Sequence, residues 1–412
     1  MKRLLFITKK YPFGSGEEFI ETEISYLAKQ FDEIIIFAVS AEKGNNARRI
    51  TPKNVIAVPL YETKNKTRRY AFTVLKGMLS LNDKELRAEL KRSPGAKGKL
   101  AALYAHARVK GNLKKINAWF NRNPEKKDIG TLYSYWFLDT AVLACKLKQS
   151  LFDTARAYSR AHGYDLYAGR NISGSTPFRE YSLRVLDGVF PCSRDGAQYL
   201  ERAYPQYSGK VRCSYLGTSD NGVCTGNADK SVFHIATCSA ITPLKRVSIV
   251  ADAVKELESL TDRKIIWTCI GDGQLLASLK EQCASFTSAE VYFKGYVPNS
   301  DVLDMYKNEF IDCFINVSEN EGLPVSIMEV QSFGTPVIAT AVGGTGEIVI
   351  DGETGFLLPP DVTGKELSEK LLSMCNLPDD EYMSFRENSR ARWCERFDAE
   401  KNYSEFSRCI GD

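Results

Sequence analysis

The chain has 412 residues, 43% of them hydrophobic and 26% charged, and this length exceeds one ordinary hydrophobic core and predicts two domains. No apolar run is long enough to span a bilayer, and the first one, Leu-Leu-Phe-Ile, is too short for a signal peptide. The eleven cysteines show no Cys-x-x-Cys pair, which favours reduced thiols in a cytoplasmic protein over a disulfide framework or a zinc site.

A net charge of +4 conceals a basic block at residues 64–127. The block holds 18 Lys or Arg against 4 Asp or Glu, a net of +14, and leaves about −10 for the rest of the chain. Charge of one sign at this density predicts an anionic partner, and the alternative is an ordinary solvated helical surface.

The first half of the chain alternates apolar runs with amphipathic helical runs. Residues 17–31 form the clearest expected helix, because apolar side chains recur there at intervals of three and four. The basic block interrupts this rhythm with further helical sequence. Strands are expected at 3–8, 33–39, 55–60, 129–136, 154–162, 188–193 and 210–216. The rhythm predicts a parallel sheet with helices on both faces.

A second series of the same kind opens near Ser231. Strands are expected at 232–239, 264–273, 290–297, 312–318 and 336–342. The sequence therefore predicts two doubly wound α/β domains that face each other across a cleft, where the carboxyl ends of their strands bind ligands. The expected divisions are an N-terminal domain at 1–217, a linker within 217–230, a C-terminal domain at 218–385 and a helical segment at 386–412.

Two glutamates flank an expected helix start in "SENEGLPVSIMEV", residues 318–330. Pro324 suits the first helical position, because its missing N–H costs nothing there. The N–H groups of Val325, Ser326 and Ile327 would then be unpaired at the positive end of the helix dipole, which is a phosphate site.

The two acids stand on either side of this phosphate site. Glu329 shares a helical face with Val325 and Ser326, so it can accept hydrogen bonds from a ribose. Glu321 precedes Gly322, where the backbone admits a ligand, so it can bind a second sugar. The pattern predicts a nucleotide-sugar site.

The "EGLPVSIME" pattern, followed by "GTPVIATAVGGTGEIVIDGETGFLLPP", resembles the family-four retaining glycosyltransferases with the GT-B fold. Further matches are "SAITPLKRV", "IGDGQL" and "VYFKGYVPNSDVLDMY", and "YPFGSGEEFIETEI" and "SRAHGYDLY" are similar to a bacterial polysaccharide-biosynthesis subgroup. The resemblance covers nearly the whole chain and is weakest over the basic block. It implies two Rossmann-like domains, with the C-terminal helix returning to the first.

The resemblance assigns roles to the C-terminal motifs. Lys245 matches the family's lysine after the first strand of the second domain, and with Arg246 it is expected to neutralise the leaving diphosphate. Ala240 stands where the family usually has an arginine, which is a departure. The donor-binding residues expected in this half are Tyr296, Val297, Gly322, Leu323, Pro324, Val325, Ser326 and Glu329, with Glu321 as a catalytic residue.

In the first domain, the glycine loop Gly14, Ser15 and Gly16 is expected to face the donor. His162 precedes Gly163 at the end of an expected strand, and the resemblance implies a contact with the donor sugar. The aromatic residues of "LYSYW", Tyr133, Tyr135 and Trp136, are expected to be core more than an acceptor platform.

The expected function is metal-independent transfer of a sugar, from UDP-sugar or secondly GDP-mannose, to a saccharide or polyprenyl-diphosphate-linked acceptor. No Asp-x-Asp occurs, so neither a metal nor another cofactor is expected. Because "LAALYAHARVKGNLKKINAWF" combines basic excess with an apolar stripe, the basic block is expected to dock on the cytoplasmic face of an anionic membrane, with Lys110, Lys114 and Lys115 at the contact.

Other classes of protein would need other features. A nucleotide-sugar epimerase of the same fold would need no acceptor. A dinucleotide oxidoreductase would need Gly-x-Gly-x-x-Gly after the first strand, which "KKYPFGSGEE" lacks. A non-catalytic nucleotide-sugar-binding or nucleic-acid-binding protein is a further alternative, although the basic block has few interleaved aromatics and no recognition motif.

Overall fold

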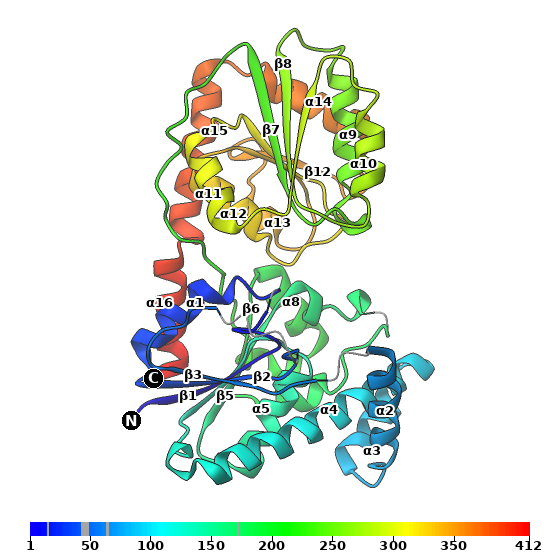
Figure 1. Cartoon of the computed structure of the whole chain (residues 1–412), viewed down its shortest axis with the longest axis vertical. Coiled ribbons are helices and arrows are strands. Elements are labelled where there is room, and N and C mark those ends of the chain that lie inside the picture. The colour runs from blue at the N-terminus through cyan, green and yellow to red at the C-terminus, as the bar shows by residue number, and fades with distance from the viewer. Residues whose placement is uncertain (15, 43–48, 63–65, 172) are drawn as a thin grey trace. The chain divides into compact units, whose positions relative to one another are not determined.

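The computed structural model describes residues 1–14, 16–42, 49–62, 66–171 and 173–412, with residues 66–69 described by backbone alone. It divides into two units, which are Met1–Ser214 with Tyr403–Asp412, and Tyr215–Asn402 (Figure 1). The division thus falls three residues before the expected boundary at 217. The segment 386–412 does not return as a whole, because only its last ten residues group with the first unit.

The first unit holds a six-stranded parallel sheet of order β3-β2-β1-β4-β5-β6. Its strands are β1 (Arg3–Thr8), β2 (Glu33–Ala38), β3 (Val55–Pro59), β4 (Thr131–Ser134), β5 (Arg156–Ala161) and β6 (Gly188–Pro191). The strand expected at 210–216 is reduced to one bridge between Val211 and Val189. Pro191 ends β6 and has no N–H for a ladder to continue.

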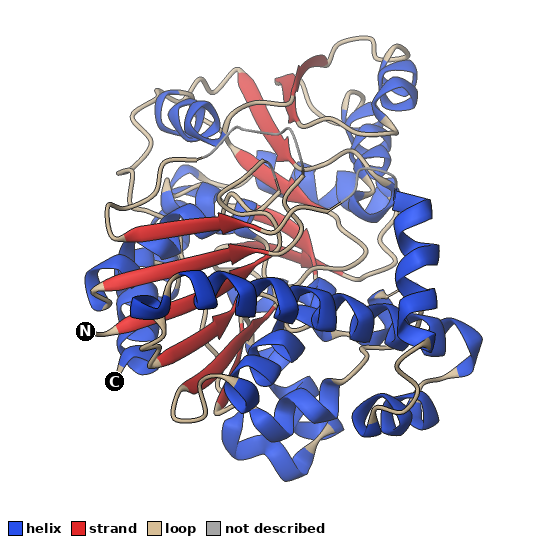
Figure 2. Ribbon diagram, turned by 60° about the horizontal axis from the view of Figure 1, so that its bottom comes forward, coloured by secondary structure: helices blue, strands red, loops and turns tan. Residues whose placement is uncertain are grey.

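Alternate residues of β1 enter the cores on opposite faces of this sheet. Leu4 and Phe6 pack with α1 (Ile20–Gln30) and α16 (Ala399–Gly411). Leu5 and Ile7 belong to the core on the other face, together with buried residues of α4 (Gly95–Arg122), α5 (Asp139–Ser150) and α7 (Arg179–Val185). Helices lie against the strands of this sheet in Figure 2. Two shorter helices follow β5 and β6, namely α6 (Gly163–Leu166) and α8 (Arg194–Ala203).

The basic block folds as α2 (Lys66–Met78), α3 (Lys84–Arg92) and α4. The apolar side of α4 is buried against the sheet, through Ala102, Leu103, Val109, Ile116 and Phe120. The expectation that this stripe faces a bilayer is therefore wrong. These apolar residues recur at helical spacing because they pack into the core of the first unit. Of the lysines expected at that contact, Lys110 and Lys115 hydrogen-bond Ser80 and the Tyr61 carbonyl.

The second unit repeats the architecture with order β12-β11-β10-β7-β8-β9, all parallel. Its strands are β7 (Val232–Cys238), β8 (Lys264–Ile270), β9 (Glu290–Gly295), β10 (Cys313–Asn316), β11 (Val337–Thr340) and β12 (Gly355–Leu358). Only β12 lies outside the expected strands, and it falls within the "GETGFLLPP" motif.

Helices cover both faces of this sheet (Figure 1). One face carries α9 (Val247–Leu257), α10 (Leu276–Cys283) and α14 (Gly364–Cys375). The other carries α11 (Asn299–Asn308), α12 (Val325–Ser332) and α15 (Asp379–Arg396), and α13 (Thr345–Ile348) follows β11.

The expected linker at 217–230 is packed along the second unit. Trp393 donates its indole N–H to the hydroxyl of Thr218 at 2.7 Å. A Cβ on Gly226 would stand 2.6 Å from the backbone nitrogen of Phe310, so only glycine fits there. Tertiary contacts therefore hold a segment whose composition is typical of a loose connection.

In both sheets the strand order reverses direction at one place, between β1 and β4 in the first and between β7 and β10 in the second. The loops that leave these paired strands diverge to opposite faces, which opens a crevice at the carboxyl edge. In the second unit, this crevice is where the predicted donor residues lie.

Candidate functional site

The two loops at the switch point of the second sheet meet through Lys245 and Glu321. The first follows β7, and the second follows β10. The Nζ of Lys245 lies 2.5 Å from Oε1 of the buried Glu321, and the Nδ2 of Asn316 lies 3.4 Å from the same oxygen. Two residues 76 positions apart therefore form one charged pair at the crevice.

The loop that carries Lys245 rests on the "IGDG" segment after β8. The N–H of Ser239 donates to the carbonyl of Ile270 at 3.0 Å, and that of Ile241 donates to Asp272 at 2.9 Å. A Cβ on Gly271, which has φ of +134°, would lie 1.9 Å from the Ser239 carbonyl oxygen. The motif is glycine-rich because two loops touch there backbone to backbone.

The start of α12 differs by one residue from the expectation. Pro324 is the N-cap, and the helix begins at Val325. The carbonyl of Pro324 accepts from the N–H of Ile327 at 3.2 Å, so that N–H is not free for phosphate. Within the described ranges, the N–H groups of Val325 and Ser326 have no partner, and they remain the anion donors at this helix end.

Gly343 fixes the Glu321 loop from the far side, and sequence reasoning missed it. Its φ is +52°, and a Cβ would stand 2.0 Å from the Glu321 carbonyl oxygen. The next residue, Gly344, donates its N–H to the Gly322 carbonyl at 2.8 Å. The signal was the glycine pair in "AVGGTGEI", but its contact partner lies more than twenty residues earlier in the chain.

Arg246 contacts backbone carbonyls, whereas Lys245 contacts a carboxylate. Its backbone has a φ of 48°, and its guanidinium donates to the carbonyls of Val317 at 2.8 Å, Ser318 at 3.3 Å and Pro360 at 2.6 Å. This geometry differs from the expected pair of cations at the diphosphate. Arg246 holds the loop after β10, which leaves the Lys245 ammonium as the cation at the crevice.

Glu329 is half-buried on α12, and the amide of Asn299 donates to its Oε1 at 2.9 Å. Burial raises the pKa of this carboxyl to about 7. Tyr296 is exposed and Val297 half-buried after β9, beside Gly295 with φ of +64°. These residues, Tyr296, Val297, Asn299 and Glu329, thus lie in the same unit as the Lys245–Glu321 pair.

In the first unit, Glu17 organises the loop after β1, a role that the sequence did not predict. Its carboxylate accepts from the N–H groups of Lys9 at 3.1 Å, Lys10 at 2.6 Å and Tyr11 at 2.6 Å, and from the Trp136 indole at 2.5 Å.

The glycine loop lies within the same turn. Gly14 and Gly16 have positive φ, 79° and 105°, so both need glycine, and Ser15 lies outside the described residues. The loop is therefore a conformationally defined turn, and its predicted role at the donor stays a prediction.

His162 caps the short helix α6, and its ring lies among aromatic rings. Its centroid is 4.7 Å from that of Tyr135 and 4.9 Å from that of Trp136. Both ring nitrogens are buried without a hydrogen-bond partner among the described residues, and Asp165 stays 3.8 Å away. Tyr133 and Tyr135 are fully buried core residues, while Trp136 is half-buried.

A cavity of about 640 Å³ lies in the first unit beside these residues. The Nζ of Lys9 stands 4.6 Å above the Trp136 ring and 5.0 Å from the Tyr164 ring. Arg108, also in the lining, is paired with Asp139 and Glu62, each at 2.7 Å. The lining includes Lys9, Ser40, Tyr70, Lys97, Tyr104, Arg108 and Tyr164. Aromatic faces and hydroxyls of this kind suit a saccharide.

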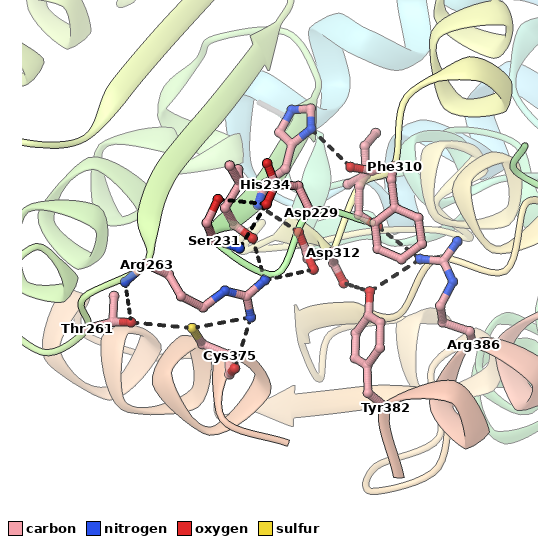
Figure 3. Close-up of polar contacts among 12 residues, drawn as sticks. Asp229, Ser231, His234, Thr261, Arg263, Phe310, Asp312, Cys375, Tyr382 and Arg386 are labelled. Carbon is pink, nitrogen blue, oxygen red and sulfur yellow. Dashed lines mark hydrogen bonds and ion pairs between the residues drawn. The ribbon is translucent and has the colours of Figure 1, made fainter. Parts of the chain in front are cut away.

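A further polar cluster stands at the amino-terminal edge of the second sheet (Figure 3). Arg263 donates to the Cys375 carbonyl at 3.0 Å and to Asp312 at 3.4 Å, and Tyr382 donates to the Asp312 carbonyl at 3.0 Å. Burial raises the pKa of Asp312. These bonds join α14 and α15 to the sheet, so the cluster is an anchor at the edge away from Lys245.

Residues 226–392 match the family described as Glycosyl transferases group 1. The second unit is a domain of this family. The group 1 domain has relatives of similar sequence: N-acetyl-alpha-D-glucosaminyl L-malate synthase of Bacillus anthracis is 27% identical over 189 residues, covering 45% of this chain and 46% of the relative. A putative colanic acid biosynthesis glycosyltransferase of Escherichia coli is 22% identical over 253 residues, covering 60% and 61%.

The chain spans only part of the length of such relatives. An uncharacterized glycosyltransferase from Methanocaldococcus jannaschii is 32% identical over 138 residues, covering 33% of this chain and 36% of the relative. Solved structures match along the whole chain. Sucrose-phosphate synthase from Thermosynechococcus elongatus has a TM-score of 0.72 at 14% identity, covering 99% of this chain and 98% of that one. HepE from Anabaena, in complex with UDP and glucose, has 0.65 at 16%, covering 100% and 99%.

These matches confirm the predicted family of the second unit and the GT-B fold of the chain. Within the described residues no helix is long and apolar enough to cross a membrane, and no group of three His, Cys, Asp or Glu is placed to hold a metal ion. The roles of the site residues stay predictions.

Proposed function

We propose that the protein is a retaining glycosyltransferase of hexosyltransferase type that acts in the synthesis of a bacterial surface polysaccharide or glycoconjugate. The observation that carries this proposal is the 2.5 Å pair of Lys245 and Glu321 at the switch point of the group 1 domain. A cation and a carboxylate at that edge are the groups needed by a leaving diphosphate and a sugar.

The donor is a nucleotide-sugar, with UDP-sugar favoured and GDP-mannose second. Lys245 and the free N–H groups of Val325 and Ser326 offset the charge of the diphosphate, while Glu329 accepts from the ribose. Glu321 binds the transferred sugar. The complex of HepE with UDP and glucose supports UDP as the first nucleotide to test.

In the transfer step, the bond from the anomeric carbon to the diphosphate oxygen breaks. The acceptor hydroxyl oxygen bonds to the same face of that carbon, and its proton passes to the leaving phosphate oxygen. Configuration is therefore retained, and a nucleoside diphosphate departs. Preorganised donors at the diphosphate each contribute roughly 3–4 kcal/mol to such a transition state, so neither a metal nor another cofactor is required.

The acceptor is a saccharide or a lipid-linked saccharide. The cavity of about 640 Å³ in the first unit is the proposed acceptor site, because its tyrosine rings can stack on sugar faces. His162 is proposed to contact the donor sugar through a ring nitrogen that has no hydrogen-bond partner among the described residues. The proposed location is cytoplasmic, with peripheral attachment to the inner face of the cell membrane.

Thermal shift against a panel of nucleotide-sugars tests the donor, and turnover of the best binder tests transfer. We expect one UDP-sugar to stabilise the wild type but not Lys245→Ala. Proton NMR of the product should show the anomeric configuration of the donor. Isomerised donor without any acceptor would identify an epimerase instead, and a salt-dependent shift with oligonucleotides in place of nucleotide-sugars would identify a nucleic-acid-binding protein.

A further inference from the structure

Helix α2 of the basic block presents an apolar stripe to solvent. Phe72, Leu75 and Met78 recur at intervals of three, and they are 57%, 56% and 45% exposed. Leu79 and Leu81, just beyond the helix, are 83% and 47% exposed. We define these five residues as the α2 stripe. Single exposed apolar residues are common on soluble proteins, but five along one helix and its end form a patch.

The opposite face of α2 already has its packing partner. Val74 is buried, and a Cβ on Gly77 would stand 2.5 Å from the Leu103 carbonyl oxygen of α4. The Tyr70 ring lies 4.8 Å from that of Tyr104, also on α4. At 100° per residue, Phe72 lies about 200° from Val74 and Leu75 about 100°, so these two face away from the packed side. Met78, about 40° from Val74, lies at the edge of the stripe and is 45% exposed. No described residue buries the stripe.

The charge around the stripe identifies what can cover it. Between residues 70 and 122 the chain has 12 Lys or Arg against 3 Asp or Glu. Lys76 lies within the stripe, with its Nζ 4.4 Å from the Phe72 ring. Lys84 is exposed just after it, and Lys110 reaches Ser80 at 3.2 Å. An anionic surface is attracted to these cations, whereas a second copy of the chain would bring like charges together.

We propose that α2 lies flat on an anionic lipid bilayer, with Phe72, Leu75, Met78, Leu79 and Leu81 inserted among the acyl chains and the surrounding lysines at the headgroups. A helix with one apolar face and flanking cations binds a bilayer surface in this way. This assigns to α2 the contact that the sequence alone placed on α4. Docking rests on the surface of the first unit and does not depend on the sugar chemistry.

One consequence does rest on the proposed function. Tyr70, on the inner face of α2, lines the cavity proposed for the acceptor. A helix is about 10–12 Å across, so a saccharide in that cavity would lie about one helix diameter from the lipid surface. A lipid-linked saccharide fits this geometry, with its sugars in the cavity and its lipid in the bilayer.

The test is flotation of the full chain with vesicles of phosphatidylcholine alone or with phosphatidylglycerol added. We expect binding only with the anionic lipid, and weaker binding as salt shortens the Debye length from about 10 Å at 0.1 M to about 3 Å at 1 M. The triple variant Phe72→Gln, Leu75→Gln, Leu79→Gln should lose at least about tenfold in partition coefficient.

A matched control is Val223→Gln, Leu260→Gln, Met383→Gln, because these residues of the second unit are similarly exposed at 54%, 42% and 50%. It should float like the wild type, and both triple variants should retain the wild-type melting temperature. The proposal is overturned if the wild type stays unbound, or if the α2 variant binds as well as the control.

A wild type that is dimeric and an α2 variant that is monomeric would also overturn the proposal, and would assign the stripe to self-association. Docking is measured without donor or acceptor. A chain that floats but transfers no sugar therefore contradicts the proposed function alone.

Discussion

The Nζ of Lys245 and the Oε1 of Glu321 lie 2.5 Å apart, although 76 residues separate them in the chain. The neighbouring Arg246 instead donates to the carbonyls of Val317, Ser318 and Pro360. The two adjacent cations therefore have different roles. Lys245 lies at the crevice, and Arg246 holds the loop that carries Glu321.

This difference predicts that substitution of Lys245 mainly lowers activity, whereas substitution of Arg246 mainly lowers stability. Lys245→Ala should lower kcat/KM by about 100-fold or more, because it removes a donor to the leaving group. Arg246→Ala should lower the free energy of unfolding by about 1–3 kcal/mol, since the carbonyl of the buried residue Val317 loses this donor. Steady-state kinetics and chemical denaturation measure both. Equal melting temperatures for Arg246→Ala and the wild type would contradict the assignment.

Gly343→Ala should displace the Glu321 loop. Gly343 and Gly352 both have positive φ, and alanine costs about 1–2 kcal/mol in that region at either position. Only at Gly343 does the new Cβ meet backbone, 2.0 Å from the Glu321 carbonyl oxygen, whereas Gly352 has open space. Both variants should lose stability through the positive φ, Gly343→Ala should lose more because of the backbone contact, and Gly343→Ala alone should lose activity as well. Equal activities relative to the wild type would show that the contact is not needed.

Glu329 predicts a pH dependence for donor binding. Its pKa is about 7 in the free protein, raised from 4.5 by burial, so the stability that this group contributes is present in acid and is lost as pH rises through about 7. Ribose hydroxyls favour the ionised carboxylate, and binding therefore releases a proton. The affinity for a UDP-sugar should rise by up to about tenfold per pH unit towards pH 7 and level off above it.

Calorimetric titration at several pH values measures that affinity. Glu329→Gln has no proton to release, so its affinity should be lower and flat across the same range. A wild-type profile parallel to that of the glutamine variant would show that Glu329 does not titrate on binding.

His162→Asn should lower kcat more than it changes stability. The imidazole nitrogens are buried without hydrogen-bond partners among the described residues, so the substitution breaks no hydrogen bond of the imidazole ring. An interaction made only with substrate would then be lost. Single-turnover kinetics with saturating UDP-sugar separates this from weaker binding. A drop in melting temperature with unchanged kcat would identify His162 as a packing residue.

Transfer should persist in excess EDTA. Lys245 and the Val325 and Ser326 N–H groups are proposed to provide the positive charge that a metal ion would otherwise supply to the diphosphate. The rate after chelation and desalting should equal the untreated rate. Loss of activity that Mg²⁺ or Mn²⁺ restores would show that the diphosphate site has been misassigned.

Much of the fold could be predicted because its signals are local. Apolar runs at strand length and helical repeats between them specify two parallel sheets, and eleven of the twelve observed strands lie in the expected segments. The family match and the GT-B fold agree with the motifs after β7, β10 and β11. Motifs are recognisable in sequence because each surrounds a single strand end, where spacing along the chain equals spacing in the loop.

Tertiary structure alone decided the partners of these residues. The spacing of the apolar stripe on α4 also predicts a bilayer-binding face. The stripe is nevertheless part of the core, because packing against the sheet removes its apolar area from water. Arg246 sits next to Lys245 in sequence, but the direction of its side chain is set by carbonyls more than 70 residues away. The roles of Glu17 and Gly343 depend likewise on contacts across loops. Sequence determines which groups each loop carries, and packing decides which of them remain free to meet a ligand.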